Sequence, residues 1–255
     1  LNGKFFADYQ EKDAFITKIK QGSFSSKVKA VFHIGACSAT TEADASYLQE
    51  NNTEYSKLLA AWSLERHIPF FYASSAATYG DGSLGYSDED QAMVNLKPLN
   101  LYGQSKQQFD LWLLANGVTN KVVGFKYFNV YGPNEYHKGE MRSLVVKAYE
   151  QIKRDGKINL FKSYLPQYID GGQKRDFVYI KDVLAVMAWF YRHLEVKGIY
   201  NVGTGQARTW NDLASAIFAA LNLTPGIQYI DMPPAIKDKY QYFTEADLTK
   251  LHRAG

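Results

Sequence analysis

Short apolar runs alternate with long helical patterns along most of this chain. Residues 28–34 (VKAVFHI) and 70–74 (FFYAS) are strand-like, and residues 45–66 between them carry apolar side chains at helical spacing. The alternation continues with a helix expected at 102–116 and a strand at 122–127. Because strands separated by helices of this length form βαβ units, the pattern predicts an α/β fold built on a parallel sheet.

The second half of the chain begins with a change of character. A turn-rich polar segment, residues 130–143, follows the strand at 122–127, and a Gly- and aromatic-rich loop is expected at 161–177. Segments of this kind indicate a smaller, lid-like domain beside the sheet. The remaining elements are predicted as helices at 11–20, 144–155, 182–194 and 209–221, and as strands at 178–180, 198–202 and 228–230.

Composition excludes several classes of protein. The 255 residues carry a net charge of only +3, which gives no basis for a nucleic-acid or membrane-surface partner. Cys37 is the single cysteine, so an internal disulfide is impossible, a cysteine-based metal site is disfavoured, and a reducing cytoplasm is expected. No apolar run approaches the ~18 residues that a membrane span requires.

One candidate acid–base group stands in residues 70–106. Tyr102 and Lys106 are four residues apart, so they share a helix face, and the Lys106 ammonium would favour the ionised form of the phenol. Ser75 ends the preceding strand. These residues predict a site that moves protons at an alcohol carbon. A plain surface pair on a helix is the alternative explanation of the same spacing.

Small or polar residues follow three of the expected strands. They are Gly35 to Ser38, Ser75 with its neighbour Ser74, and Asn129. Ligands bind at the carboxyl ends of the strands in parallel α/β sheets. These residues are therefore expected to line one crevice.

Five motifs occur in the order and spacing of the extended short-chain dehydrogenase/reductase family, which the chain resembles over essentially its whole length. They are FYASSAATYG, LNLYGQSK, FKYFNVYGP, KRDFVYIKDV and YNVGTG. Within the family, GACSATTE, SSAATYG, YFNVYGPNEYHKG and RDFVY resemble the members that invert C6 of an ADP-activated heptose. The resemblance implies a Rossmann-like, doubly wound parallel sheet that binds NADP, with a smaller α/β substrate domain. It also implies a homo-oligomer.

The resemblance further implies domain boundaries and one departure. The dinucleotide-binding domain would comprise residues 1–132 plus 176–205, and the substrate domain residues 133–175 plus 206–255. The family's first strand and its GxxGxxG turn, which holds the cofactor pyrophosphate, have no counterpart here. We therefore expect this sequence to be truncated at both ends and to lack the first βα unit. The choice of NADP over NAD is implied by the resemblance alone.

The resemblance assigns catalytic roles to four residues. Tyr102 would be one general acid/base, Lys106 would lower its pKa and bind the nicotinamide ribose, and Ser75 would steady the reacting oxygen. The family's scheme is transient hydride transfer to NADP⁺, which gives a planar ketone, followed by return of the same hydride to the opposite face. Because both faces of the ketone must meet one hydride, a second acid/base is useful. Lys138 is the candidate, with His137 as a competitor.

The binding residues implied by the resemblance form two groups. Arg175 suits a diphosphate because a guanidinium makes bidentate, charge-assisted bonds, although a salt bridge to Asp176 or Asp182 is the alternative. Glu140 and Lys147 stand where the family has Ser and His. The cofactor group is Lys12, Ile34, Gly35, Ala36, Cys37, Ser38, Asn51 (or Asn52), Lys106, Val130 and Lys138. The substrate group is Ser75, Asn129, Glu140, Lys147, Phe161, Lys162, Ser163, Tyr164, Arg175 and Tyr240, and no metal is expected.

Three other functions compete with this prediction. A nucleotide-sugar 4,6-dehydratase would carry Asp-Glu after the catalytic serine, where this chain has Ala76 and Ala77, so elimination is disfavoured. A UDP-sugar 4-epimerase uses the same Ser, Tyr and Lys but needs no Lys138. A non-catalytic binding relative would explain the missing Gly-rich turn but not the intact triad.

Overall fold

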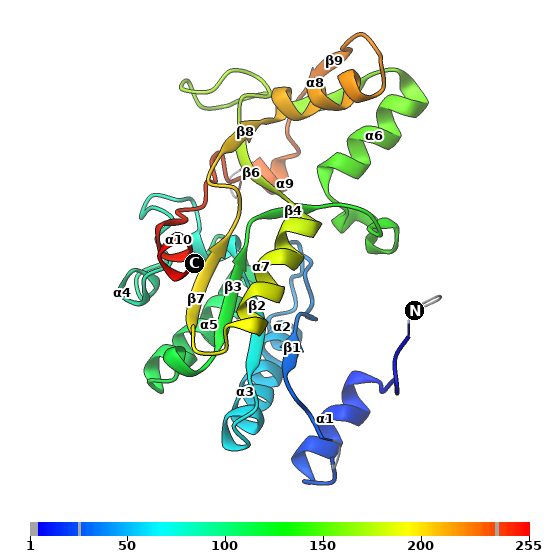
Figure 1. Cartoon of the computed structure of the whole chain (residues 1–255). Helices are drawn as coiled ribbons and strands as arrows, with labels where there is room; N and C mark the ends of the chain where they lie inside the picture. Colours follow the sequence, from blue (N-terminus) through cyan, green and yellow to red (C-terminus); the bar gives the residue numbers. More distant parts are fainter. Residues whose placement is uncertain (1–4, 25–26, 238–239) are drawn as a thin grey trace.

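A parallel sheet forms the centre of the molecule, in a computed structural model that describes residues 5–24, 27–237 and 240–255 (Figure 1). Its strands are β1 (Val31–His33), β2 (Phe70–Ser75), β3 (Val123–Tyr127) and β7 (Gly198–Val202), in the order β1-β2-β3-β7. All three pairings are parallel. The predicted α/β fold with a parallel sheet is therefore confirmed.

Helices cover both faces of this sheet because its strands alternate apolar side chains between the two faces. Phe70 and Tyr72 of β2 pack with Leu59 and Trp62 of α3 (Tyr55–Glu65) and with Phe109 and Leu113 of α5 (Leu101–Ala115). Phe71 points to the opposite face, where it packs with Phe125 of β3 and with Phe190 of α7 (Ile180–Arg192). A strand buried on both faces reads as a continuous apolar run, which explains FFYAS.

The helix predicted at 45–66 is three consecutive segments. They are α2 (Ala45–Leu48), a π-helical stretch η1 (Gln49–Glu54) and α3. Asp44 caps the start through its carboxylate, which accepts a hydrogen bond from the Tyr47 amide at 2.9 Å. The π-helical register was not predicted, because apolar periodicity does not separate it from an α-helix.

Two smaller sheets build the other end of the molecule. One has the order β4-β6-β8, formed by β4 (Asn129–Tyr131), β6 (Lys174–Tyr179) and β8 (Ala207–Thr209); the other pairs β5 (Ile158–Phe161) with β9 (Ile227–Ile230). The prediction that 161–177 is a loop was wrong from Lys174 onward, where β6 begins. Of the other strands in these two sheets, β9 was predicted at 228–230, whereas β4, β5 and β8 were not predicted.

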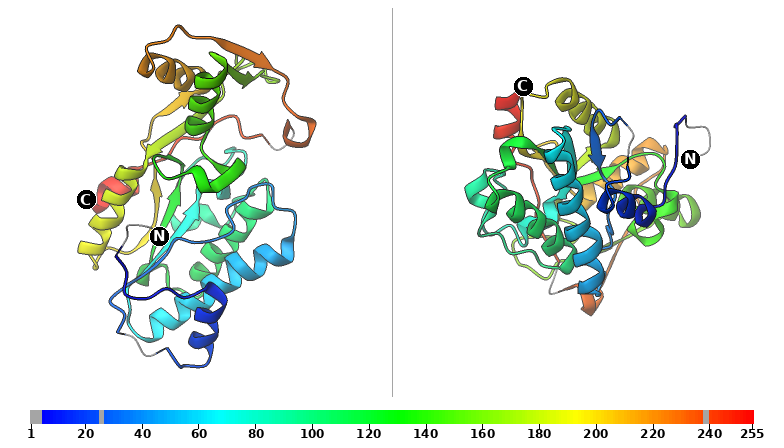
Figure 2. Two further views of the ribbon diagram at one scale, coloured as in Figure 1. Left: turned by 90° about the vertical axis from the view of Figure 1, so that its right-hand side faces the viewer. Right: turned by 90° about the horizontal axis from the view of Figure 1, so that it is seen from below.

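Helices α6 (Leu144–Asp155) and α8 (Trp210–Ala220) pack with β5 and β9 at this end (Figures 1 and 2). The core there contains Ile152, Ile158 and Phe218. It is separate from the two cores of the main sheet, which supports the predicted smaller domain without fixing its boundaries. In the described part of the chain, no helix is long and apolar enough to cross a bilayer.

Short elements complete the chain. They are α1 (Lys12–Lys20), η2 (Ala76–Tyr79), α4 (Asp90–Met93), η3 (Thr119–Lys121), η4 (Tyr136–Met141), α9 (Pro234–Lys237) and α10 (Thr249–Ala254).

Candidate active site

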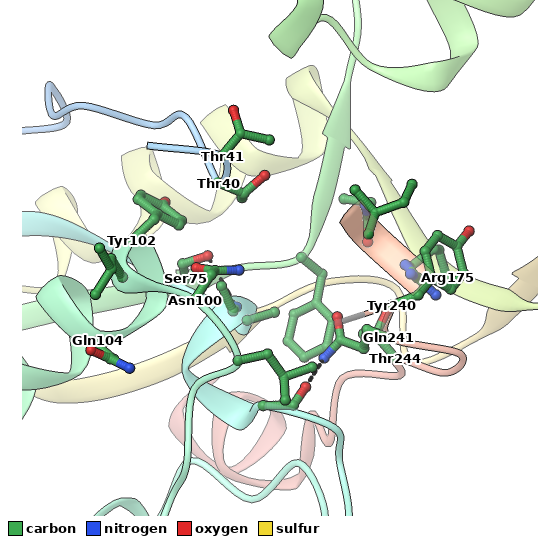
Figure 3. A pocket seen from close by; sticks show the side chains of 18 of the residues that line it. Thr40, Thr41, Ser75, Asn100, Tyr102, Gln104, Arg175, Tyr240, Gln241 and Thr244 are labelled. Atoms are coloured by element: carbon green, nitrogen blue, oxygen red, sulfur yellow. Dashed lines mark hydrogen bonds between the residues drawn. The ribbon is translucent and has the colours of Figure 1, made fainter. Parts of the chain in front are cut away.

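A cavity of about 850 Å³ opens at the carboxyl ends of β2 and β3, beside the smaller end of the molecule (Figure 3). Ser75 and Tyr102 lie on one side of it, and Arg175 and Tyr240 lie together on the other. Asn129 also lines it. Of the residues predicted to share one crevice, Ser75 and Asn129 line this cavity, whereas Gly35 to Ser38 and Ser74 do not. The cavity joins residues as far apart in the sequence as Thr40 and Thr244.

The position of Tyr102 follows from the start of α5. The Asn100 side chain accepts a hydrogen bond from the Gly103 amide at 2.8 Å and so caps the helix. Gly103 lets this first turn approach η2: a Cβ there would lie 2.7 Å from the Ala77 carbonyl oxygen. Ser75 in turn caps η2, because its hydroxyl accepts from the Ala77 amide at 3.1 Å. Tyr102 and Ser75 are thus held side by side.

The electrostatics of Tyr102 differ from the prediction. Burial raises the pKa of the Tyr102 phenol above 10.0, the Ser75 hydroxyl lowers it, and Cys37 raises it. Lys106 is not a cause of the shift. Its Nζ instead donates to the Ala73 carbonyl at 2.8 Å. The expected lowering of the Tyr102 pKa by Lys106 is therefore absent in this structure, because the ammonium is bound to the strand.

Lys106 itself is buried. Burial lowers the pKa of its ammonium from 10.5 to about 8, and the charge of Asp110, one helical turn further along α5, opposes that shift. The imidazole of His33 on β1 lies near the Lys106 ammonium. Burial, first, and the charge of Lys106, second, lower the pKa of His33 from 6.5 to about 4. His33, Lys106 and Asp110 form a buried corner below Tyr102, which we call the α5 corner. At neutral pH its histidine is therefore neutral.

Arg175 on β6 forms the opposite wall. The side chain is buried, yet no acidic group of the described residues lies within 4 Å of its guanidinium. Its Nη1 donates to the Lys174 carbonyl at 2.8 Å, and its plane lies over the rings of Trp210 and Tyr240, 5.5 and 5.3 Å from their centroids. The alternative salt bridge to Asp176 does not form, because Asp176 accepts instead from Thr204. A buried, unpaired cation is suited to an anionic ligand.

Lys138 lies on η4, outside the residues that line the cavity. Its Nζ is 3.8 Å from the Glu135 carboxylate, and 45% of its side chain is exposed. Glu135 is buried and accepts from the amide and hydroxyl of Ser143 at 2.8 Å. The structure therefore does not bring Lys138 next to Tyr102, and its catalytic role stays a prediction.

The other residues expected to bind substrate are divided. Glu140 and Lys147 pair with each other at 3.1 Å near η4 and do not line the cavity. The segment from Phe161 to Tyr164 does not line the cavity and packs behind Tyr240, which does. The Phe161 ring centroid is 6.1 Å from that of Tyr240, and the Tyr164 amide donates to the Tyr242 hydroxyl at 3.0 Å. Lys162 pairs with Asp231 at 3.2 Å, and Ser163 donates its amide to Asp170 at 2.7 Å.

The residues expected to bind cofactor gather at the end of β1. Ile34 to Ala36 and Ser38 are exposed, and a Cβ on Gly35 would meet no atom within 4 Å. Asn52 fixes the backbone of Cys37 by accepting from its amide and donating to its carbonyl, both at 2.9 Å. Asn51 instead binds Lys12 through its side chain. Val130 lies on β4, partly buried.

This end of β1 fits the nicotinamide half of a dinucleotide. It offers open, small-residue backbone at a strand end, adjacent to the helix that carries Tyr102 and Lys106. Ile34 to Ser38 do not line the cavity, but Thr40 to Ala43, directly downstream, do. In the described chain, no group of three or more His, Cys, Asp or Glu side chains could hold a metal ion.

Several lining residues were missed from the sequence. They include Thr40, Thr41, Asn100, Gln104, Trp210, Gln241 and Thr244. Thr40 and Thr41 stand within GACSATTE, and Gln104 stands between Tyr102 and Lys106, so their motifs already signalled them. Trp210 carried no such signal. It reaches the cavity because β8 pairs antiparallel with β6, which places α8 beside Arg175.

Comparison with known proteins places these motifs in a family. The profile of the NAD dependent epimerase/dehydratase family matches residues 7–203. A relative in Nitratidesulfovibrio vulgaris strain DP4, an ADP-L-glycero-D-manno-heptose-6-epimerase, is 54% identical over all 255 residues, which span 79% of its length. A protein of the same name in Fusobacterium nucleatum is 44% identical, with 98% of this chain and 78% of that protein covered.

Solved structures share the fold. The Helicobacter pylori ADP-L-glycero-D-manno-heptose-6-epimerase superposes with a TM-score of 0.73 at 29% identity, covering 87% of this chain and 65% of that one. A Thermus thermophilus UDP-glucose 4-epimerase in complex with NAD gives 0.74 at 24% identity, covering 95% and 75%. The second likeness concerns the fold alone.

Proposed function

The chain belongs to the NAD dependent epimerase/dehydratase family, and within it we propose that the protein inverts C6 of an ADP-activated glycero-manno-heptose. The observation that carries this proposal is that Ser75 and Tyr102 face Arg175 across one cavity, and that this buried cation has no acidic partner among the described residues. One side can act on an alcohol, and the other can hold a diphosphate. The relatives at 44 and 54% identity, which bear the name of this epimerase, support the choice of sugar.

An unactivated carbinol carbon cannot be inverted by deprotonation, because its C–H bond is far too weakly acidic. The family's nicotinamide dinucleotide supplies, when bound, an acceptor and donor of hydride. Ile34 to Ser38 and Lys106 would hold its nicotinamide half. NADP, rather than NAD, is the form we propose, on the resemblance of the motifs alone.

Side chains of the protein transfer the proton of the reacting hydroxyl and bind its oxygen. The Tyr102 phenolate takes the proton of the C6 hydroxyl, becomes a phenol and later returns that proton, while the Ser75 hydroxyl donates a hydrogen bond to the same oxygen. Proton transfer by the ionised phenol requires that its raised pKa fall when ligands bind, and the Lys106 ammonium is the nearest positive charge on the same helix face. Lys138 is proposed as the acid/base for the opposite face.

Arg175 positions the substrate. Its guanidinium can donate two parallel hydrogen bonds to a diphosphate, and the rings of Trp210 and Tyr240 keep it from turning away. Because the cation has no acidic partner among the described residues, an anion that binds it displaces no existing ion pair.

The test is epimerisation itself. The protein, expressed from its complete reading frame, is incubated in D2O with NADP⁺ and ADP-D-glycero-D-manno-heptose, and the two C6 epimers are followed by NMR. We expect a mixture of both epimers with no deuterium at C6, because the hydride that leaves is the one that returns. Interconversion of UDP-glucose and UDP-galactose, with no change in the heptose, would contradict the proposed substrate. Deuterium at C6 would contradict the redox route.

A further inference from the structure

A fully buried ion pair lies directly beneath the candidate active site. Asp110 of α5 and Lys126 of β3 have no exposed side-chain surface, and Lys126 Nζ is 2.7 Å from Asp110 Oδ2. Neither residue lines the cavity. A buried pair is weak evidence for stability, since an apolar pair of similar volume is often as stable. Its presence here therefore calls for another reason.

The hydrogen bonds of the pair fix α5 against β2 in one register. Tyr72 and Ser74 of β2 donate their hydroxyls to the two oxygens of Asp110, each at 2.7 Å. One turn earlier on the same helix face, Lys106 donates to the carbonyl of Ala73. Tyr102, another turn earlier, lies beside Ser75. Three successive turns of α5 thus contact the last four residues of β2, and sliding by one residue would break every contact.

Lys126 extends this network to the helical turn that holds Ser75. Its Nζ donates to the Thr78 hydroxyl at 2.8 Å, and the Thr78 hydroxyl in turn donates to the Ser75 carbonyl at 2.8 Å. The ammonium also lies over the ring of Tyr79, 5.3 Å from its centroid. Lys126 is therefore linked to Ser75 by hydrogen bonds through Thr78, and Asp110 acts on Lys106 through its charge.

We propose that Asp110 and Lys126 are positioning residues, which hold Ser75, Tyr102 and Lys106 in register and provide the carboxylate that offsets the buried ammonium of Lys106. The proposal rests on the proposed function only for its catalytic consequence. The structural and electrostatic parts concern the protein by itself.

The charged and titratable groups around Lys106 come from three elements. Asp110 and Tyr102 share its helix, His33 faces it from β1, Cys37 follows β1 beside Tyr102, and Lys126 reaches Asp110 from β3. Asp110 is the only acid that the described residues place near Lys106, and its charge raises the pKa of that ammonium against the effect of burial. Loss of this carboxylate should make Lys106 lose its proton at a lower pH.

The experiment compares Asp110→Asn with the double variant Asp110→Asn/Lys126→Met. The single change leaves Lys126 buried without its partner and is expected to destabilise the fold strongly; the double change removes both charges and is expected to fold. The titration of Lys106 is followed by NMR on protein labelled with ¹³C at lysine Cε, its signal assigned by its loss in Lys106→Met. In the folded double variant we expect the midpoint to fall, because loss of the Asp110 carboxylate is only partly offset by loss of the Lys126 ammonium next to it.

Two controls separate charge from packing. Ser74→Ala removes one hydrogen bond to Asp110 and keeps both charges, so the Lys106 midpoint should stay at its wild-type value. Lys57→Met breaks the surface pair with Glu54 and should also leave it unchanged. A folded double variant with the wild-type midpoint would overturn the proposal, as would an equal shift in Ser74→Ala.

A second readout links the pair to catalysis. In the double variant, the alkaline limb of kcat/KM for the epimerisation should move to lower pH by the same amount as the NMR midpoint. A purely structural role would lower the rate at every pH and leave the limb in place. If the protein failed to epimerise any heptose, the NMR titration would still test the electrostatic part, so failure of the proposed function and failure of this inference are distinguishable.

Discussion

The two regions that supply the proposed acid–base groups are built in opposite ways. Tyr102 stands on a helix whose inner face is fixed by buried hydrogen bonds: Lys106 donates to a β2 carbonyl, and Asp110 accepts from a β2 hydroxyl. Lys138 stands on the short turn η4, with 45% of its side chain exposed and a 3.8 Å contact to Glu135 as its ion pair. An exposed pair of this kind contributes about 0–1 kcal/mol, too little to hold a side chain in one place.

The difference separates what packing fixes from what it leaves free. In the α5 corner, moving one group means leaving others buried without partners, so the geometry is set before any ligand arrives. On η4, rotation of Lys138 costs little, so this side chain can reach different positions. In the proposed mechanism, the α5 corner would supply an acid/base group that is already in place, and η4 one that the substrate has to bring into place.

The largest effect is expected from Tyr102→Phe. It removes the phenol that the proposed mechanism uses as general acid/base in the cavity, and general acid–base groups contribute about 10²–10⁴-fold to rate. We expect kcat for epimerisation to fall by about 10³-fold with little change in unfolding free energy. Tyr136→Phe, on an exposed tyrosine of η4, is the matched control and should keep full activity. Comparable activity in both variants would remove Tyr102 from the mechanism.

A smaller effect, on stability, is expected from Lys126→Met alone. This change leaves the buried Asp110 carboxylate without its cation, and breaking one side of a buried pair costs about 3–5 kcal/mol. Urea denaturation measures the loss of unfolding free energy. Lys57→Met, at the surface pair with Glu54, should cost less than about 1 kcal/mol. Equal costs would mean that the two regions are not built differently after all.

Lys138→Met tests the exposed region directly. If this lysine is the second acid/base, kcat should fall by about 10²-fold, equivalent to about 2.7 kcal/mol of barrier, while unfolding free energy stays near that of the wild type. Lys153→Met, at an exposed position of α6, is the control. Full activity in the Lys138 variant would leave Tyr102 as the sole base and remove η4 from the chemistry.

The last expected effect is a pH dependence that belongs to the buried corner. Because the folded-state pKa of His33 lies at about 4, below its ordinary 6.5, the unfolded chain binds more protons between these values. This part of the stability is present above pH 6.5 and is lost as the pH falls toward 4, by about 3 kcal/mol.

The His33→Asn variant should lose that part of the slope in urea titrations at several pH values. His252→Asn, at an exposed position of α10, should keep it. An unchanged slope in the His33 variant would show that the corner does not hold this histidine in its neutral form.

Elements with long, regular patterns could be predicted from the sequence. Helix α6 was predicted at its observed bounds, and α5 began one residue before its predicted start. Strands β4, β5 and β8 were not predicted, although β1 and β9, which are as short, were predicted from their apolar, β-branched residues. The π-helical stretch within 45–66 was missed because apolar spacing does not report the hydrogen-bond register.

The sequence by itself determined the parallel α/β fold, the family and the grouping of Ser75, Tyr102 and Arg175, because these depend on local periodicity and on motifs that remain recognisable along the chain. Only the tertiary structure decided which groups the buried charged side chains bind. Lys106 lies at the same helix spacing from Tyr102 and from Asp110, yet its ammonium donates to a β2 carbonyl. Hydrogen bonding and burial are set by neighbours far away in sequence, and spacing along one helix cannot report them.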